Sequence, residues 1–171
     1  MKNLKLITIL LLFTSALFAS CGYQFEGGGY INSDVTHVAV EMMDNKSSET
    51  GADIKFTNAL IKEIMEKTDT KITDTSKAIA ILKGKINSIT FATLSRSTSE
   101  SVMERRVTAN VDIQLFNKDG KIIWAVKNFS SNEDYKVSDD SITDESNKAE
   151  AVNKISIRMA EKIVSKMMNN F

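Results

Sequence analysis

Apolar residues recur along this chain at intervals that differ between segments, and these intervals predict its helices. Between residues 49 and 67 they recur every three or four positions, as in a helix with one buried face. The residues expected on that face are Ile54, Phe56, Ala59, Leu60, Ile61, Ile64 and Met65. A similar stripe runs from about Ser146 to Met168. The patterns predict two amphipathic helices, each of which needs a surface to cover.

Alternation of apolar and polar residues predicts strands elsewhere. The clearest alternation runs from Val107 to Leu115. An Asp-Gly pair at 119–120 follows, which predicts a tight hairpin and a return strand over 122–129, in the longer reading to 135. We expect Ile122, Trp124 and Val126 on the buried face of this strand. Two earlier strands are expected at 36–42 and 78–94.

The order of these elements predicts the fold class. A strand, a helix, three strands and a helix suggest an α+β two-layer sandwich, with a four-stranded mixed sheet and both helices packed on one face. A right-handed crossover through the first helix would make the first two strands parallel. The other sheet face is expected to be polar and to include Thr108, Asn110, Asp112 and Gln114. In the residues alone, a solvated surface explains this polar face more simply than a binding site does.

The N-terminus has the pattern of an export signal. Lys2 and Lys5 precede a short apolar run that ends before small residues, and the run is about half the roughly 20 residues of a membrane-spanning helix. Cys21 is the single cysteine and stands at the expected cleavage point. We expect a signal peptide over 1–20, a tether over 21–34 and one domain over 35–171.

The segment around Cys21 resembles the lipobox of bacterial lipoproteins. Phe18-Ala19-Ser20-Cys21 matches it except that Phe18 stands where Leu is more usual. The resemblance implies a lipid on Cys21 and sorting to the outer membrane, since Gly22 and not Asp follows the cysteine. The alternative is an ordinary signal peptide with an incidental cysteine.

Composition argues against catalysis and nucleic-acid binding. The chain has 22 basic and 22 acidic residues, which gives no excess of positive charge for a nucleic acid. His37 is the only histidine, so no histidine cluster can hold a metal or activate a nucleophile. We therefore expect no catalytic residues, no metal site and no cofactor.

Several short motifs follow one another along the chain. They are Cys21-Gly22-Tyr23-Gln24-Phe25, Thr57-Asn58-Ala59-Leu60, Leu82-Lys83-Gly84-Lys85-Ile86, Val111-Asp112-Ile113 and Asp119-Gly120-Lys121-Ile122-Ile123-Trp124. Taken in order, they resemble the LptE family of lipopolysaccharide-assembly lipoproteins. One departure is the absence of a proline in the first strand, where this chain has Val38-Ala39-Val40. The resemblance implies a protein that sits inside the LptD outer-membrane β-barrel, helps it to assemble, and binds lipopolysaccharide on its way to the cell surface.

The resemblance also gives the polar residues candidate roles. The polar face of Thr108, Asn110, Asp112 and Gln114 would contact the barrel, whose interior is polar. A cluster of arginines is expected where the second and third predicted strands join, and these side chains could bind lipid phosphates. They are Arg96, Arg105 and Arg106. The alternative is a solubilising hairpin tip in which Glu100 and Glu104 pair with these arginines.

Two other functions stay open at this point. The first is a lipoprotein that binds another envelope assembly, such as a secretin, through the same polar face. The second is a periplasmic hydrolase, which the absence of a nucleophile motif argues against.

Overall fold

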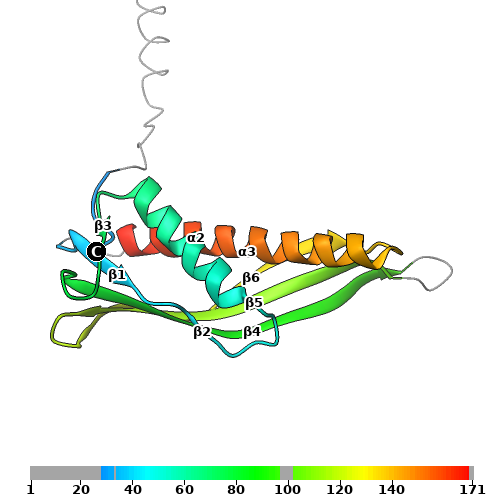
Figure 1. The fold of residues 1–171 in the computed structure, drawn as a ribbon, viewed down its shortest axis with the longest axis horizontal. Coiled ribbons are helices and arrows are strands. Elements are labelled where there is room, and N and C mark those ends of the chain that lie inside the picture. Colours follow the sequence, from blue (N-terminus) through cyan, green and yellow to red (C-terminus); the bar gives the residue numbers. More distant parts are fainter. Residues whose placement is uncertain (1–27, 33, 97–101, 170–171) are drawn as a thin grey trace, which may run out of the picture.

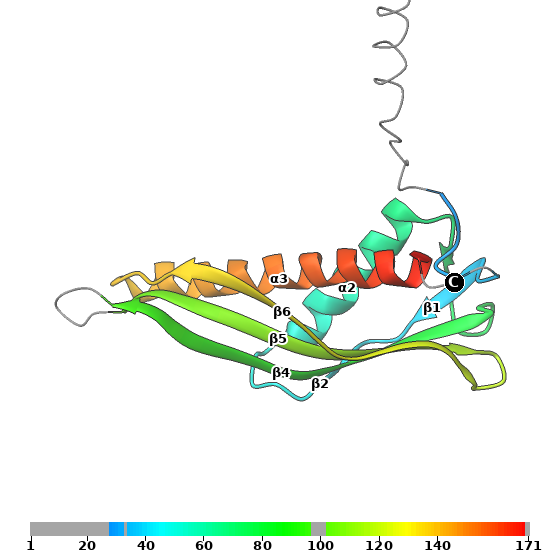
Figure 2. The same ribbon diagram turned by 180° about the vertical axis from the view of Figure 1, so that it is seen from behind.

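The computed structural model describes residues 28–32, 34–96 and 102–169, and only the backbone of Arg96 and Val102. In this part of the chain a six-stranded mixed sheet is covered on one face by two helices, as Figures 1 and 2 show from opposite sides. The α+β class predicted from the sequence is confirmed. The sheet has two more strands than predicted, because β2 and β3 are only two residues long and too short to show an alternation.

The elements alternate early in the chain and become long strands later. In chain order they are β1 (His37–Val40), β2 (Asp44–Asn45), α2 (Ala52–Lys67), β3 (Lys71–Ile72), β4 (Ala80–Arg96), β5 (Val102–Asn117), β6 (Ile122–Lys136) and α3 (Ser141–Asn169). The strand order is β3-β1-β4-β5-β6, and β2 pairs with β4 outside this path. β6 is therefore one edge of the sheet.

The predicted parallel pairing of the first two strands is confirmed. Val38 of β1 lies opposite Ala80 of β4 in a parallel ladder, and α2 lies between the two strands in the chain. The segment after β1 is held to α2 by the buried hydroxyl of Thr57, which accepts a hydrogen bond of 3.0 Å from the Met43 N–H. Thr57 belongs to one of the motifs noted above, and this contact gives it a structural role.

The buried face of α2 is narrower than the sequence predicts. Phe56, Leu60 and Ile64 are buried, but Ile54 and Met65 are 51% and 64% exposed. The prediction that Ile54 and Met65 face the core is wrong, since the helix buries residues mainly at intervals of four and these two lie on the far side of the helix from that face.

The last helix, α3, extends along the long strands (Figures 1 and 2). It begins at Ser141, five residues before the predicted start, because the Asp140 carboxylate accepts hydrogen bonds from the Thr143 N–H at 2.8 Å and the Thr143 hydroxyl at 2.6 Å. These bonds, the hydroxyl bond foremost, lower the pKa of Asp140. The stripe from Val152 to Met167 is buried as predicted.

Two β-bulges flank β5 at the same level. In β4 the extra residue is Asn87, which falls between the pairs Ile86–Val111 and Ser88–Asn110. In β6 the register shifts between Val126 and Phe129, around Asn128, whose φ is +51°. Each bulge changes which residues of its strand face the helices.

A further register shift near the start of β6 affects Ile122. This shift lies between the pairs Leu115–Trp124 and Phe116–Ile122. Trp124 is buried as expected, but Ile122 is 45% exposed, so the prediction that Ile122 shares its buried face is wrong.

Candidate partner-binding face and ligand-binding end

The four polar residues predicted for partner binding lie together on β5. Thr108, Asn110, Asp112 and Gln114 alternate with the fully buried Val107–Leu115 series, so they share the sheet face away from the helices. All four side chains are half-buried. The geometry therefore provides a continuous polar strip along β5.

Asp112 links both bulges to β5. Its Oδ1 accepts a hydrogen bond of 2.8 Å from the Asn128 N–H and another of 2.9 Å from Nδ2 of Asn87. The same Asn87 amide donates to Oδ1 of Asn110 at 2.8 Å. Two of the four predicted contact residues are thus committed to holding the sheet together, which sequence reasoning missed because the partners are 16 to 25 residues away.

The surroundings of Asp112 favour its charged form. The hydrogen bond from the Asn128 N–H is the main reason that the pKa of Asp112 is lowered, and Asn87 adds to it. Lys85, with Nζ at 3.8 Å from Oδ2, and Lys127 act in the same direction, while partial burial opposes them. The strip carries a stable negative charge at its centre.

The predicted arginines fall into different environments. Arg106 continues the polar strip and makes a bidentate pair with Asp134 of β6, with Nε–Oδ1 at 2.7 Å and Nη2–Oδ2 at 2.8 Å. The hydrogen bonds of this pair raise the pKa of Arg106 and lower the pKa of Asp134. Within the described residues Arg106 pairs with Asp134 and not with Glu104, and Glu100 lies outside those residues.

Arg105 lies on the opposite face of β5, where it shares the alternation of Val107 and is opposite Tyr135 of β6. Its side chain is half-buried and makes no ion pair or hydrogen bond with any residue that the structure describes. Arg96 ends β4, opposite Val102 of β5, and its side chain lies outside the described part. Of the two predicted arginines whose side chains the structure describes, Arg106 is paired and Arg105 is not.

Exposed apolar side chains occur at the same end of the molecule. Leu94 in β4, Met103 in β5 and Ile142 at the start of α3 are 43%, 53% and 79% exposed. The Val137 N–H donates to the Met103 carbonyl at 2.9 Å, which joins the end of β6 to the start of β5 here. Sequence reasoning considered only charge at this end and missed these residues.

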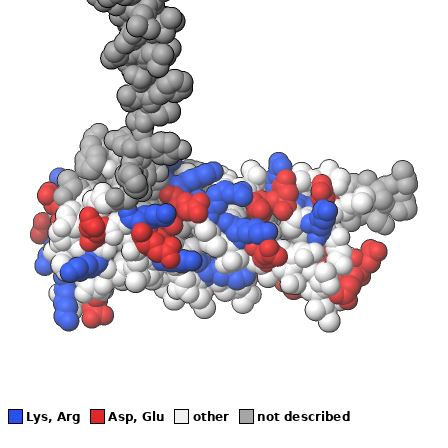
Figure 3. All heavy atoms as spheres, turned by 90° about the horizontal axis from the view of Figure 1, so that it is seen from above, with Lys and Arg blue, Asp and Glu red and all other residues white. Residues whose placement is uncertain are grey.

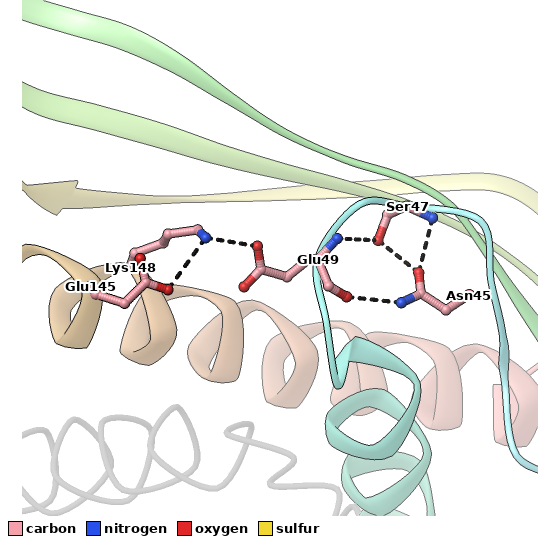
Figure 4. Close-up of polar contacts among 5 residues, drawn as sticks. All are labelled: Asn45, Ser47, Glu49, Glu145 and Lys148. Atoms are coloured by element: carbon pink, nitrogen blue, oxygen red, sulfur yellow. Dashed lines mark hydrogen bonds and ion pairs between the residues drawn. The ribbon is translucent and has the colours of Figure 1, made fainter.

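A polar cluster fixes the loop before α2 to α3 (Figure 4). Lys148 Nζ lies 3.0 Å from Oε2 of Glu49 and 3.4 Å from Oε1 of Glu145, and 5.1 Å from the centre of the Phe91 ring. Burial opposes the charge of Lys148, but the two glutamates outweigh it, and the pKa of Lys148 is raised. Asn45 braces the loop by donating to the Glu49 carbonyl at 2.8 Å.

The helical face carries charges of both signs. Figure 3 shows basic and acidic side chains interspersed over this face, with no large area of one sign. Among residues 28–32, 34–96 and 102–169, no group of three potential ligand side chains could hold a metal ion. No helix in these ranges has the length and apolar character needed to cross a membrane. Cys21 and the tether lie outside the described residues, apart from the end of the tether.

The sequence over residues 35–167 matches the model of a known family, LptE, which is described as lipopolysaccharide-assembly. This match spans more than half of the chain. The chain belongs to the LptE family. Membership confirms the resemblance found in the sequence motifs and places the protein in a lipopolysaccharide-assembly family. No match was found among curated protein sequences.

Solved structures of lipoproteins share the LptE fold seen here. Lipoprotein B from Nitrosomonas europaea has a TM-score of 0.57 at 15% identity, covering 86% of this chain and 90% of that one. Rare lipoprotein B from Shewanella oneidensis has a TM-score of 0.54 at 18% identity, covering 76% and 96%. A minor lipoprotein from Acinetobacter baumannii has a TM-score of 0.51 at 10% identity, covering 80% and 92%. At these identities the likeness concerns the fold alone.

Proposed function

We propose that this protein is an outer-membrane lipoprotein, anchored by lipid on Cys21, that plugs and helps to assemble the LptD β-barrel. The family match over residues 35–167 carries the proposal. The polar strip on β5 supports it, because a plug inside a barrel must present polar groups to a polar lumen. The mixed charges of the helical face make that face a less specific partner surface (Figure 3).

The second part of the proposal concerns the ligand. Lipopolysaccharide combines phosphate groups with acyl chains. The end of the molecule where β4 ends and β5 begins, here called the hairpin end, has a cationic side chain for the phosphates and apolar side chains for the acyl chains. Arg105 is a cation without a partner among the described residues, and Leu94, Met103 and Ile142 expose apolar surface near it. Arginine suits phosphate through paired, charge-assisted hydrogen bonds. We place lipopolysaccharide binding at this end, with Arg96 and Arg106 as further contacts.

The test is affinity purification of the full lipoprotein from outer membranes, with identification of the bound proteins by mass spectrometry. The expected result is an LptD barrel at an approximately equal molar amount. Recovery of a secretin or another assembly, with no LptD, would contradict the proposal and favour the other envelope role considered above.

A further inference from the structure

The strand β6 is a long edge, and its two halves differ in how their outer side is covered. The opposite edge of the sheet is β3, which has two residues, whereas β6 has 15. An edge strand exposes unpaired backbone N–H and carbonyl groups that can pair with another chain. The outward backbone groups of β6 that lack a hydrogen-bond partner therefore indicate where another strand could pair.

The half of β6 beyond the bulge is covered by side chains of α3. Because the Val137 N–H bonds to β5 and bonding directions alternate along a strand, the carbonyls of Lys136 and Asn132 face outward. Nδ2 of Asn147 donates to the first of these carbonyls at 3.0 Å, and Nη1 of Arg158 donates to the second at 2.9 Å. Both of these carbonyls are satisfied by the helix, although the same alternation also turns the backbone groups of Ser130 and Asp134 outward.

The half before the bulge has no such cover. The Met103 carbonyl accepts a hydrogen bond from β6, so Met103 turns its backbone groups toward β6. Because these directions alternate along β5, Gln114 turns its backbone groups toward β4. Ala125, which lies opposite Gln114 in β6, therefore turns its own backbone groups outward, away from β5. No residue in the described part of the chain bonds to these outward groups of Ala125. Ile122 and Ile123 are 45% and 37% exposed beside it, and both are good strand formers.

The charges at the ends of the uncovered half of β6 indicate which kind of strand could pair with it. Lys121 and Lys127 are exposed at its two ends, and neither makes an ion pair or a side-chain hydrogen bond within the described residues. In an antiparallel pair of two copies centred on residue 124, Lys121 of one copy would approach Lys127 of the other, which is unfavourable. A strand with acidic side chains would neutralise both lysines.

We propose that residues 122–127 of β6 accept an additional β-strand from a partner polypeptide with acidic side chains. Backbone hydrogen bonds supply the affinity, and the lysines at the ends select the charge. This inference is independent of the proposed function, because it concerns the strand edge and neither the polar strip on β5 nor the hairpin end.

The experiment uses the full lipoprotein in detergent and two synthetic peptides, one alternating Val with Glu and the other alternating Val with Lys. Hydrogen exchange of the 122–127 amides is measured by mass spectrometry with each peptide. The Val-Glu peptide should slow exchange several-fold, and the Val-Lys peptide should not. Slowing by neither peptide, equal slowing by both, or a dimer in sedimentation that buries this edge would overturn the proposal.

Two variants separate the backbone from the charge. Ala125→Pro removes an outward N–H without removing a bond to β5, so it should abolish the effect of the Val-Glu peptide, whereas the control Ala125→Val should retain it. Joint replacement of Lys121→Glu and Lys127→Glu keeps every backbone group and should reverse the preference between the peptides. An unchanged preference in a folded double variant would also contradict the proposal.

Discussion

Met43 packs directly over Gly84, leaving no room for a methyl group between them. A Cβ atom added at Gly84 would lie 2.8 Å from Cγ and Cε of Met43, and 2.9 Å from Cδ1 of Ile113. These contacts are shorter than van der Waals distances, so Met43 and Ile113 would have to shift to admit a side chain at the glycine of the Leu82–Ile86 motif. Met43 itself is buried, with its N–H bonded to Thr57.

Gly84→Ala should therefore lower the free energy of unfolding by about 1 to 3 kcal/mol, the usual cost of overpacking a core. Chemical denaturation of the purified protein measures the change. The combination with Met43→Ala should be less destabilising than the sum of the two single changes, because the smaller side chain vacates the space. Strict additivity would show that the contact is not the cause.

Asp112→Ala should destabilise the protein by about 1 to 2 kcal/mol, since it leaves the Asn128 N–H and the Asn87 amide without their acceptor. Chemical denaturation of this variant, with the neighbouring Gln114→Ala as control, measures the difference. Equal stability of the two variants would exclude a role for Asp112 in holding the bulges.

The same carboxylate predicts a pH dependence. Its folded pKa is below the value of about 3.9 expected in the unfolded chain. The folded state therefore binds this proton less readily, and the stabilisation is present above the unfolded pKa and lost as pH falls through the folded pKa. Asp112→Asn should lose less stability than wild type between pH 5 and pH 2. Parallel acid-denaturation curves would contradict this.

Replacement of Arg105 and replacement of Arg106 should differ in their effect on lipopolysaccharide binding. Arg105→Glu should weaken binding by about 1.5 to 3 kcal/mol, the contribution of a charged hydrogen bond, because this side chain has no described protein partner. Arg106→Glu should have a smaller effect, because Arg106 is already paired with Asp134. Calorimetric titration with lipopolysaccharide measures both, and circular dichroism checks folding.

The variant that changes Arg96, Arg105 and Arg106 together to Glu tests the whole site. Binding should fall further than in Arg105→Glu alone while the fold persists. Unchanged binding in a folded triple variant would remove the ligand site from this end and leave a solubilising role for the arginines.

Photo-cross-linkers at Thr108 and Gln114 should trap the LptD barrel in intact cells, because both residues lie on the polar strip and make no side-chain bond among the described residues. The matched controls are Lys154 and Lys162, which are exposed on α3. Efficient trapping only from the α3 positions would show that the helical face contacts the barrel.

Cys21→Ser should abolish incorporation of labelled fatty acid and leave the thermal unfolding of the domain unchanged. Residue 21 precedes the matched family region, and Ile31 is the first buried core residue among those that the structure describes. Metabolic labelling followed by immunoprecipitation measures the lipid. Label on the Ser variant would show that the lipid is attached elsewhere.

The spacing of apolar residues predicted those helices and strands in which one face stays buried over many residues. The β5 alternation from Val107 to Leu115 and the α3 stripe are found as predicted, since one buried face imposes one period on each. The bulges interrupt this rule. The apolar residues of β4 pass from even positions up to Ile86 to odd positions from Ile89, and this change in the sequence was a usable signal for the bulge at Asn87.

The candidate site was less predictable because it depends on register. The composition of β5 gave the polar strip, but which residue lies opposite Arg106 follows from the pairing of β5 with β6 and from the bulge between them. Asp134 was therefore not identified as its partner. The covering of β6 by Asn147 and Arg158 depends on how α3 lies along the edge of the sheet, which the apolar stripe of the helix alone does not define.

The bulges also affect how this sequence can be compared with others. A relative whose strand runs straight past Asn87 or Asn128 would have one residue fewer at that point. Its sequence would then align with this one only through single-residue gaps at the two sites. An alignment without those gaps would place buried positions of one protein opposite exposed positions of the other beyond each bulge. Sequence similarity along the long strands would then go undetected.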